Sequence, residues 1–464
     1  MKRLNTQEHV HFIGIGGYGM SAIARVLLDM GYRVSGSDEV RQELTEKLAA
    51  RGALVYIGHQ AEHVRGADLV VYSSALPKDN VEIVEAEKLN IPIIHRAQML
   101  ARLLNARRGV AVAGAHGKTT TSSMIALIME AGDLDPTYII GGEIMNVGSN
   151  AKAGKGEFVV AEADESDGSF LQYHPQYAVV TNIEADHLEN YDGKFENLKN
   201  AYVQFLSQVK PGGKAVLCLD DPYVQELVPG LRCDILTYGI HSDAAFKARN
   251  VELGDRRVRF AVEREGEGLG TIELSVPGIH NVYNALAALI VGLEAGLSFQ
   301  QIASSLAKFR GAKRRFQVIG EYDDILVIDD YAHHPTEIEA TIAAAKSTGK
   351  RIIAVFQPQR YTRTYFLLEQ FSRAFGEADE VILTDIYSPS GEKRIEGVSS
   401  ARLAELIAKN SNPNVRYIPD KDEVLSFLTA HVRPGDLVLT MGAGDIYKTA
   451  HALVQALQSR QGIQ

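Results

Sequence analysis

Short runs of β-branched residues alternate with helical patterns of hydrophobic residues along nearly the whole chain. Residues 10–13 form the first apolar run, and apolar positions between Ile23 and Met30 then recur at helical spacing. The same pattern predicts further strands at residues 32–35, 68–72, 91–94, 109–113, 158–161 and 177–183. Strands that alternate with helices in this way are typical of α/β proteins with largely parallel sheets.

The pattern changes twice along the chain. Between residues 246 and 277, polar and apolar residues alternate between glycine-rich breaks, which predicts antiparallel strands on a mixed sheet. Helices are predicted at 281–295 and 298–309, and a new series of strands at 324–329, 351–356, 380–384, 415–418 and 436–441. Because basic clusters at residues 107–108 and 313–315 lie between these series, we predict three domains, at residues 1–108, 109–312 and 313–464.

The composition excludes several classes of protein. A chain of 464 residues exceeds the range of one hydrophobic core, and 48 Lys and Arg against 58 Asp and Glu leave a net charge of −10. That charge is spread without long runs, which disfavours a protein that wraps nucleic acid. The longest apolar stretch, residues 285–293, is too short to span a membrane, and the polar N-terminus carries no export signal. We therefore expect a cytoplasmic enzyme in which Cys218 and Cys233 are reduced.

A glycine-rich loop follows the first predicted strand. Residues 14–19 fit the pattern G-x-G-x-x-G between a strand and a helix, and Asp38 lies at the end of the next strand. Glycines let backbone amides approach a pyrophosphate, and an acidic side chain on the second strand can bind a ribose or base. The pattern leaves three alternatives open: a nicotinamide or flavin dinucleotide, another nucleotide diphosphate, and a tight turn without a ligand.

A second glycine-rich loop, residues 114–120, has the sequence GAHGKTT and lies between the strand at 109–113 and a helix. In such a phosphate loop the amides and Lys118 would hold the β- and γ-phosphates of a triphosphate, and the Thr119 hydroxyl would face Mg²⁺. Its spacing is shorter than that of the common G-x-x-x-x-G-K-[ST] form. A glycine-rich turn with a solvated lysine is the alternative.

Acidic residues and a histidine follow the next two strands of the second domain. Mg²⁺ prefers oxygen ligands, so carboxylates at a strand end beside a phosphate loop predict a metal site, with a solvated acidic turn as the alternative. His187 follows the strand at 177–183 and would reach the same edge of the sheet. The carboxylates that follow the strand at 158–161 are Glu162, Asp164, Glu165 and Asp167.

Polar residues also gather at two strand ends of the third domain. One segment, residues 329–335, has the sequence DDYAHHP, and the other, residues 357–363, has the sequence QPQRYTR. His, Arg and Tyr side chains at adjacent strand ends suit a small anionic substrate, because an arginine can bind a carboxylate through two hydrogen bonds. Helix capping and surface ion pairs are the alternative. His333 and His334 lack the partner spacing of a catalytic zinc site.

In this order, the motifs resemble those of the Mur ligase family over the full length of the chain. The matching segments are GAHGKTT, EADESD, NIEADH, HNVYN, DDYAHHP and RYTR. The resemblance implies a three-domain α/β enzyme. A Rossmann-like N-terminal domain would bind a UDP-sugar and no nicotinamide. A central P-loop ATPase domain with a mixed sheet would bind ATP and Mg²⁺, and a Rossmann-like C-terminal domain would bind the incoming amino acid.

The resemblance also implies roles for individual residues. The UDP-sugar would be bound by Gly14, Gly16, Gly17, Gly19, Asp38, Ser73 and Ser74. ATP would be bound by Gly114, Ala115, His116, Gly117, Lys118, Thr119, Thr120, His280, Asn281, Asn284 and Arg314. The metal would be bound by Thr119, Glu162 and His187, and the amino acid by Tyr331, His333, Arg360 and Arg363. The catalytic residues would be Lys118, His187, His333, Arg360 and Arg363.

Two positions bear on the branch of the family. Several Mur ligases carry a carbamylated lysine about fifteen residues after the Asp-His pair, where this chain has Tyr202, and the branch that adds L-alanine lacks that lysine. Gln359 stands where alanine-adding enzymes often have histidine, which leaves the amino-acid contact there open. The resemblance thus implies that L-alanine is joined to the carboxylate of UDP-N-acetylmuramate through an acyl phosphate, with release of ADP and phosphate, in peptidoglycan precursor synthesis.

Three other functions remain as alternatives. The nearest is a ligase that attaches murein tripeptide to the same UDP-sugar. The other two belong to different functional classes. One is an NAD(P)-dependent oxidoreductase, which the first glycine-rich loop allows, and the other is a nucleotide-switched binding protein without amide chemistry. For the ligase we expect a monomer or weak homodimer that neither binds nucleic acid nor inserts into a membrane.

Overall fold

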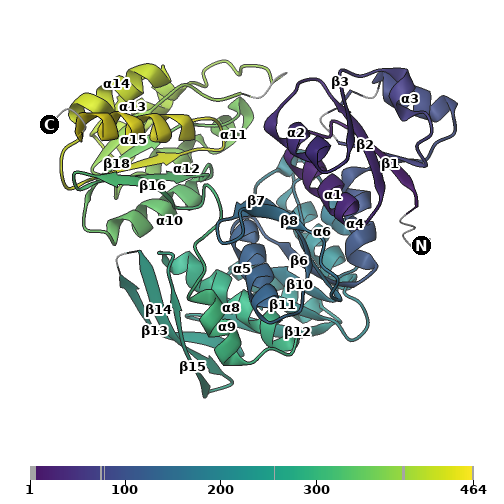
Figure 1. The fold of residues 1–464 in the computed structure, drawn as a ribbon. Helices are drawn as coiled ribbons and strands as arrows, with labels where there is room; N and C mark the ends of the chain where they lie inside the picture. The colour runs from purple at the N-terminus through teal and green to yellow at the C-terminus, as the bar shows by residue number, and fades with distance from the viewer. Residues whose placement is uncertain (1–6, 74–75, 78, 255, 389–391, 462–464) are drawn as a thin grey trace. The chain divides into compact units, whose positions relative to one another are not determined.

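The computed structural model describes residues 7–73, 76–77, 79–254, 256–388 and 392–461. The strands in these residues form three sheets, each built from one continuous part of the sequence (Figure 1). Helices connect most of the consecutive parallel strands, so the predicted α/β class is confirmed. None of the helices in the described ranges combines the length and the apolar character that crossing a bilayer requires.

The N-terminal sheet has the strand order β3-β2-β1-β4-β5, and its neighbouring strands are parallel. This order reverses beside β1, and open α/β sheets bind ligands at such a reversal. The strands are β1 (His9–Ile13), β2 (Arg33–Asp38), β3 (Leu54–Ile57), β4 (Leu69–Tyr72) and β5 (Ile93–His95). The helices are α1 (Tyr18–Asp29), α2 (Glu43–Ala50), α3 (Val81–Lys88) and α4 (Arg96–Asn105).

The central sheet has the order β15-β14-β13-β12-β11-β10-β6-β9-β7-β8. Its parallel strands are β6 (Arg108–Ala113), β9 (Phe158–Glu162), β10 (Tyr177–Val180), β11 (Lys214–Cys218) and β12 (Asp234–Gly239). The edge strand β8 (Ser149–Lys152) is antiparallel to β7 (Thr137–Ile144). The helices are α5 (Lys118–Ala131), α6 (Phe195–Ser207), α7 (Pro222–Leu227), α8 (Ile279–Glu294) and α9 (Phe299–Leu306).

The other end of the central sheet has the antiparallel character that the polar and apolar alternation predicts. The strands there are β13 (Phe246–Gly254), which pairs with β12 in parallel, β14 (Arg257–Arg264) and β15 (Glu267–Leu274). β14 and β15 are neighbours joined by two residues, a connection that only an antiparallel pair can make. By contrast, β6 and β10 are almost fully buried, which explains why they read as continuous apolar runs. The predicted mixed sheet is confirmed.

The C-terminal sheet has the order β16-β17-β21-β18-β19-β20. Its strands are β16 (Gln317–Tyr322), β17 (Ile325–Asp330), β18 (Arg351–Phe356), β19 (Glu380–Leu383), β20 (Val415–Tyr417) and β21 (Asp436–Met441). Only β16 is antiparallel to its neighbour in the described residues, so the carboxyl ends of β17 and β18 meet at one edge, on either side of β21. The helices are α10 (Pro335–Lys346), α11 (Tyr361–Phe366), α12 (Leu368–Arg373), α13 (Ser400–Asn410), α14 (Lys421–His431) and α15 (Tyr447–Gln461).

The chain divides into two compact units. One comprises residues 1–249, 261–272 and 283–308, and the other comprises residues 250–260, 273–282 and 309–464. In the first unit α1 packs against β7 and β8, and one hydrophobic core includes residues of both the N-terminal sheet and the central sheet. Arg108 is the first residue of β6, and residue 313 lies between α9 and β16. The domain boundaries near 108 and 312 stay predictions.

One predicted strand is too long. The strand predicted at 177–183 is β10, which ends at Val180, because the next residues turn to the phosphate loop instead of continuing the ladder. The side chains of Thr181 and Asn182 donate hydrogen bonds to the carbonyl of His116, at 2.6 and 3.0 Å. The amide of His116 donates to Oδ1 of Asn182 at 2.8 Å. Local apolar character could not show that these side chains would support a loop.

Glu82 is a fully buried carboxylate in the first turn of α3. Oγ of Ser37 donates to it at 2.7 Å, and ring nitrogens of His63 and His11 lie 2.9 and 3.1 Å from its oxygens. Burial by itself raises the pKa of Glu82, but hydrogen bonds from these three side chains outweigh it and hold the pKa at about 2. The ionised carboxylate therefore contributes to the stability of the N-terminal domain.

We expect Glu82→Gln to lower the free energy of unfolding at pH 7 by about 3 kcal/mol, because the variant keeps the size of the side chain but loses its charge. Since the folded pKa lies below the ordinary value near 4.5, this contribution is complete above pH 4.5 and is lost as the pH falls toward 2. Urea unfolding of both proteins at pH 7 and pH 3 tests this. A stability difference that is as large at pH 3 as at pH 7 would contradict the assignment.

Candidate active site

The first glycine-rich loop lies at the carboxyl end of β1 and leads into α1. The amide of Gly14 donates to the carbonyl of Ser37 at 2.8 Å, and the amide of Gly16 donates to Oδ2 of Asp38 at 2.8 Å. Gly16 has no room for a side chain, because a Cβ there would lie 2.2 Å from Nε2 of Gln42. Asp38 therefore flanks the loop and also fixes its backbone.

Other residues predicted to bind the UDP-sugar surround this loop. Oγ of Ser73 lies 4.0 Å from the place of a Cβ on Gly14, Gly17 precedes the first residue of α1, and Gly19 lies in its first turn. Ser74 lies outside the described residues. The Glu82 cluster adjoins this edge through Ser37 and was not predicted from the sequence. Its members are separated along the chain, and the only local signal is the carboxylate in the first turn of a helix.

The second glycine-rich loop connects β6 to α5. Gly114 has φ +136° and Gly117 has φ +84°, backbone conformations that favour glycine. Side chains would also collide there: a Cβ on Gly114 would lie 2.0 Å from Oγ1 of Thr181, and one on Gly117 would lie 2.5 Å from Oδ1 of Asn284. The loop thus brings bare backbone to the N-terminus of α5, which is the arrangement that binds phosphate in other proteins.

Lys118, the first residue of α5, is directed at the acidic segment. Its Nζ donates to the two carboxylate oxygens of Glu165, at 2.9 and 3.0 Å, and to the carbonyl of Gly114 at 2.5 Å. Burial alone lowers the pKa of Lys118, but the charges of Glu165 and Asp164 outweigh it, and the pKa is raised. The lysine is therefore protonated, and the structure brings together the phosphate loop and the acidic segment.

The predicted metal ligands occupy three different elements. Glu162 ends β9, and its Oε1 accepts a hydrogen bond from the amide of Gly141 at 2.6 Å. Thr119 lies in the first turn of α5, and His187 has φ +54° before a short 3₁₀ helix. Within the described ranges, Glu162 and His187 belong to no preformed group of three metal-binding side chains. Such a sparse set fits Mg²⁺, which usually keeps waters and phosphate oxygens among its ligands.

Three of the residues predicted to bind ATP belong to the start of α8 (Ile279–Glu294). Asn284 lies in the first unit, where its Oδ1 accepts a hydrogen bond from Oγ1 of Thr121 in α5 at 3.1 Å. His280 and Asn281 belong to the second unit, and Nε2 of His280 lies 3.2 Å from Nδ2 of Asn281. Burial lowers the pKa of His280 to about 4, and its buried Nδ1 has no hydrogen-bond partner among the described residues. A neutral imidazole with an unpaired nitrogen fits a nucleobase.

Tyr331, His333 and Arg363 come together beyond the ends of β17 and β18. Nδ1 of His333 lies 2.9 Å from the carbonyl of Tyr331, and the two rings pack edge to face with centroids 5.3 Å apart. Burial is the main cause that lowers the pKa of His333 to about 4, and the charge of Arg363 lowers it further against the nearby Glu337. Arg363 donates to Oε1 of Gln359 at 2.9 Å. His333 is therefore neutral at physiological pH.

Two other arginines differ in their settings. Arg360 is exposed and has φ +67° at the start of α11. Arg314 instead lies between the rings of Tyr331 and Tyr447, with 5.0 and 4.7 Å from its guanidinium carbon to the ring centroids. Its contact with ATP stays a prediction. In the structure its guanidinium donates three hydrogen bonds, to Asp329 and to the carbonyls of Gly442 and Gly444.

The loop after β21, residues 442–445, was missed in the sequence analysis. It has the sequence GAGD and lies between the two predicted polar segments, because β21 lies between β17 and β18. Gly442 has φ +145°, and a Cβ there would lie 2.7 Å from the carbonyl of Gln357. The closely spaced glycines after an apolar strand were the signal that could have identified this loop.

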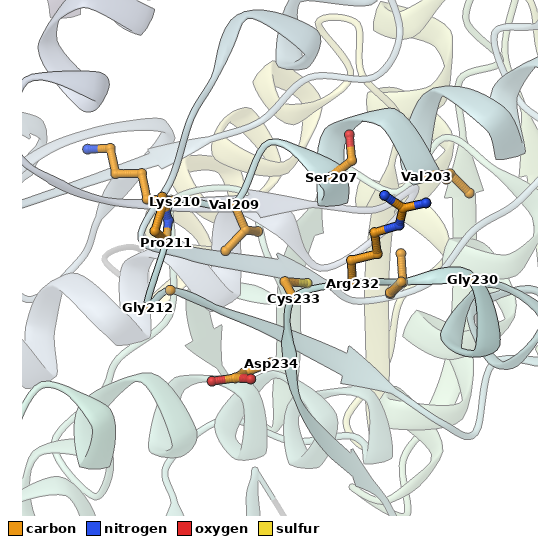
Figure 2. Close-up of a pocket in the computed structure, with 12 residues that line it drawn as sticks. Val203, Ser207, Val209, Lys210, Pro211, Gly212, Gly230, Arg232, Cys233 and Asp234 are labelled. Carbon is orange, nitrogen blue, oxygen red and sulfur yellow. The ribbon is translucent and has the colours of Figure 1, made fainter.

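A cavity of about 570 Å³ lies elsewhere in the first unit (Figure 2). It is lined by the end of α6 and by residues 209–213 and 230–234, which include the free thiol of Cys233. These loops precede β11 and β12, whereas the phosphate loop follows β6, and the three strands are parallel in one sheet. The cavity therefore lies at the opposite edge of the sheet and holds none of the predicted site residues.

Family models match the chain in three consecutive parts. Residues 9–108 match the model described as Mur ligase family, catalytic domain. Residues 112–292 match the Mur ligase middle domain, and residues 314–444 match the Mur ligase, glutamate ligase domain. The three matches follow the order of the three sheets.

Full-length relatives agree with these matches. The chain is 51% identical over 458 residues to the UDP-N-acetylmuramate–L-alanine ligase of Symbiobacterium thermophilum, covering 97% of this chain and 95% of the relative. It is 50% identical over 463 residues to the enzyme of the same name from Pelotomaculum thermopropionicum, covering 99% of this chain and all of the relative.

Solved structures agree in fold. The UDP-N-acetylmuramate-alanine ligase MurC of Thermotoga maritima superposes with a TM-score of 0.81 at 30% identity, covering 97% of this chain and 99% of that one. A murein peptide ligase of Psychrobacter arcticus has a TM-score of 0.71 at 24% identity, covering 97% and 98%, and shows the shared fold alone. With three consecutive parts matched by models of one family, and with about half of its residues identical to those of full-length relatives, the chain belongs to the Mur ligase family.

Proposed function

We propose that the protein is an ATP-dependent ligase that joins L-alanine to the carboxylate of UDP-N-acetylmuramate, with release of ADP and phosphate, in peptidoglycan precursor synthesis. The observation that carries the proposal is the setting of Lys118, partly buried in a phosphate loop and bonded to the carboxylate of Glu165 near a neighbouring strand end. The names of the full-length relatives support the choice of L-alanine and of the sugar nucleotide.

Amide formation from a carboxylate is unfavourable in water, so the carboxylate has to be activated. Transfer of the γ-phosphoryl group of ATP to the sugar carboxylate would break the bond to ADP and form an acyl phosphate. The amine of alanine would then attack the acyl carbon, and phosphate would leave. Lys118 and the amides at the start of α5 would offset the negative charge of the transferring group, and no residue of the chain becomes covalently modified.

Residues of the central domain would hold the nucleotide and its metal. Thr119, Glu162 and His187 would bind Mg²⁺, which when bound neutralises charge on the phosphates. The backbone of residues 114–120 would bind the phosphates, and the unpaired nitrogen of His280 would face the base.

The C-terminal domain would bind alanine. Arg363 would bind its carboxylate, because a guanidinium offers two parallel hydrogen bonds. Since Nδ1 of His333 lies beside the carbonyl of Tyr331, the proton of the neutral imidazole belongs on Nδ1, and Nε2 is left as an acceptor for the alanine amine. Tyr331 would therefore act by fixing the tautomer of His333.

Release of phosphate tests the proposed function most directly. The protein would be incubated with UDP-N-acetylmuramate, L-alanine and MgATP, and phosphate and ADP would be measured with each component omitted in turn. We expect release only when all three substrates are present. If phosphate is released with murein tripeptide but not with alanine, the substrate is the tripeptide and not alanine. Phosphate release without any acceptor would contradict a ligase.

We expect Asp38→Ala to weaken binding of UDP-N-acetylmuramate by about tenfold, because the variant loses a polar contact and the carboxylate that fixes the Gly16 amide. The affinity for ATP should not change. Titration calorimetry with each ligand measures both effects, and fluorescence titration with NADH is the control for the glycine-rich loop. Saturable NADH binding in the micromolar range by the unmodified protein would favour an oxidoreductase instead.

A further inference from the structure

Each of the three donors of Lys118 has an acceptor in the structure. An ammonium group carries three N–H bonds. In the structure four acceptors surround Nζ of Lys118: the two oxygens of Glu165, at 2.9 and 3.0 Å, the carbonyl of Gly114 at 2.5 Å and, more distantly, the carbonyl of Ala115 at 3.4 Å. No donor is left for a phosphate, so a nucleotide can engage this lysine only if at least one of these contacts is given up.

Two hydrogen bonds hold the main chain of Glu165. Its carbonyl accepts hydrogen bonds from the hydroxyl of Tyr191 and from the amide of Gly168, the latter at 3.1 Å. These contacts anchor the main chain of the acidic segment. The side chain, of which 7% is exposed, reaches Lys118 from the anchored backbone. Release of the lysine would therefore involve the side chain of Glu165 and not its main chain.

The carboxylate of Glu165 resembles a phosphate in the features that a phosphate loop recognises. It offers two oxygens to one ammonium group at hydrogen-bond distance. Burial raises the pKa of Glu165, and the charge of Lys118 acts against this and favours the ionised form. We propose that Glu165 is a positioning residue that substitutes for a phosphate of ATP: it holds Lys118 while the nucleotide is absent and is displaced from the lysine when ATP binds. This inference rests on the proposed function only in taking ATP as the ligand.

Displacement of Glu165 has a measurable cost. If the phosphate loop is free for ATP in only a fraction of molecules, the apparent affinity for ATP is reduced by that fraction. Weakening the internal pair should therefore tighten ATP binding. A Glu165→Gln variant keeps the size of the side chain and one acceptor but removes the charge, and we expect its dissociation constant for ATP to fall about tenfold.

The measurement is titration calorimetry with MgATP and with a nonhydrolysable ATP analogue, on the full chain. The KM for ATP should fall in parallel, and kcat should not rise, because the change affects binding before the chemical step. Labelling of Lys118 by an amine-reactive reagent, followed by mass spectrometry without nucleotide, should increase in Glu165→Gln. If Glu165 had a purely structural role, its replacement would lower thermal stability but would neither tighten ATP binding nor increase the labelling of Lys118.

Asp167→Asn is the matched control. It also removes one carboxylate charge from the acidic segment, but Asp167 pairs with Arg96 at 3.5 Å and not with Lys118. Asparagine can still accept the hydrogen bond from the amide of Ser169, so the turn should keep its shape. The control therefore separates release of the lysine from a general reduction of negative charge near the triphosphate.

A second variant, Glu165→Asp, keeps the charge but is shorter by one methylene group, so it should give an ATP affinity between those of the unmodified protein and Glu165→Gln. It also serves if Glu165→Gln does not fold. An ATP dissociation constant that is unchanged or higher in a folded Glu165 variant would overturn the proposal, as would an equal gain in Asp167→Asn. The two proposals can fail separately. If the Glu165 variants bind ATP more tightly but the unmodified protein releases no phosphate with its substrates, this inference is supported and the ligase function is contradicted.

Discussion

Lys118→Ala should lower the rate of phosphate release by about a thousandfold or more, because the ammonium group is the side-chain cation at the start of α5 that would offset charge on the transferring phosphoryl group. Binding of UDP-N-acetylmuramate should stay within about twofold of the unmodified protein, since its predicted residues lie at the edge of the N-terminal sheet. The two effects together assign the two glycine-rich loops to different ligands.

Single-turnover phosphate release and calorimetry with the UDP-sugar are the measurements. Removing Lys118 leaves the buried carboxylate of Glu165 without its partner, so thermal unfolding has to be compared as well. Lys118→Met, which keeps the length of the side chain without its charge, and the double variant Lys118→Ala with Glu165→Gln are the controls. Loss of UDP-sugar affinity in a folded variant would show that the two loops do not serve separate ligands.

Arg363→Ala should raise the KM for L-alanine by about tenfold to a hundredfold, because a charged bidentate contact contributes about 1.5–3 kcal/mol. The dissociation constant for ATP should hardly change. Initial rates against alanine concentration give the first value, and calorimetry gives the second. Arg360→Ala is the useful comparison, since Arg360 is exposed and Arg363 lies close enough to His333 to affect its pKa. An unchanged KM in Arg363→Ala would remove this residue from the amino-acid site.

The same assay bears on the choice of amino acid. A pocket for a methyl side chain cannot strongly reject glycine or serine, because one methylene or hydroxyl group gives only about 10–200-fold discrimination. Slow turnover of both is therefore expected. A preference for murein tripeptide over alanine would change the substrate while keeping the ligase.

The sequence by itself determined many of the elements and the contiguous motifs, but not the strands β3, β8, β11, β12 and β16. An apolar run can be recognised in the sequence without knowing which strands it pairs with. The strand predicted at 351–356 therefore coincides with β18, and the strand predicted at 436–441 coincides with β21. The strand β7 was not predicted, because two glycines interrupt its apolar pattern at residues 141–142. The phosphate loop could be recognised for the same local reason: its glycines, lysine and threonine are consecutive and follow an apolar strand.

Only the tertiary structure decided which of these groups contact each other. Lys118 and Glu165 are 47 residues apart, and their hydrogen bonds depend on how β6 and β9 pair in the sheet. The buried Glu82 contacts side chains from other elements, and Arg314 bonds to Asp329 in β17 and to the loop that follows β21. No local pattern encodes such contacts, because they arise from the pairing of distant strand ends, and burial at those ends then sets the charge state of each group.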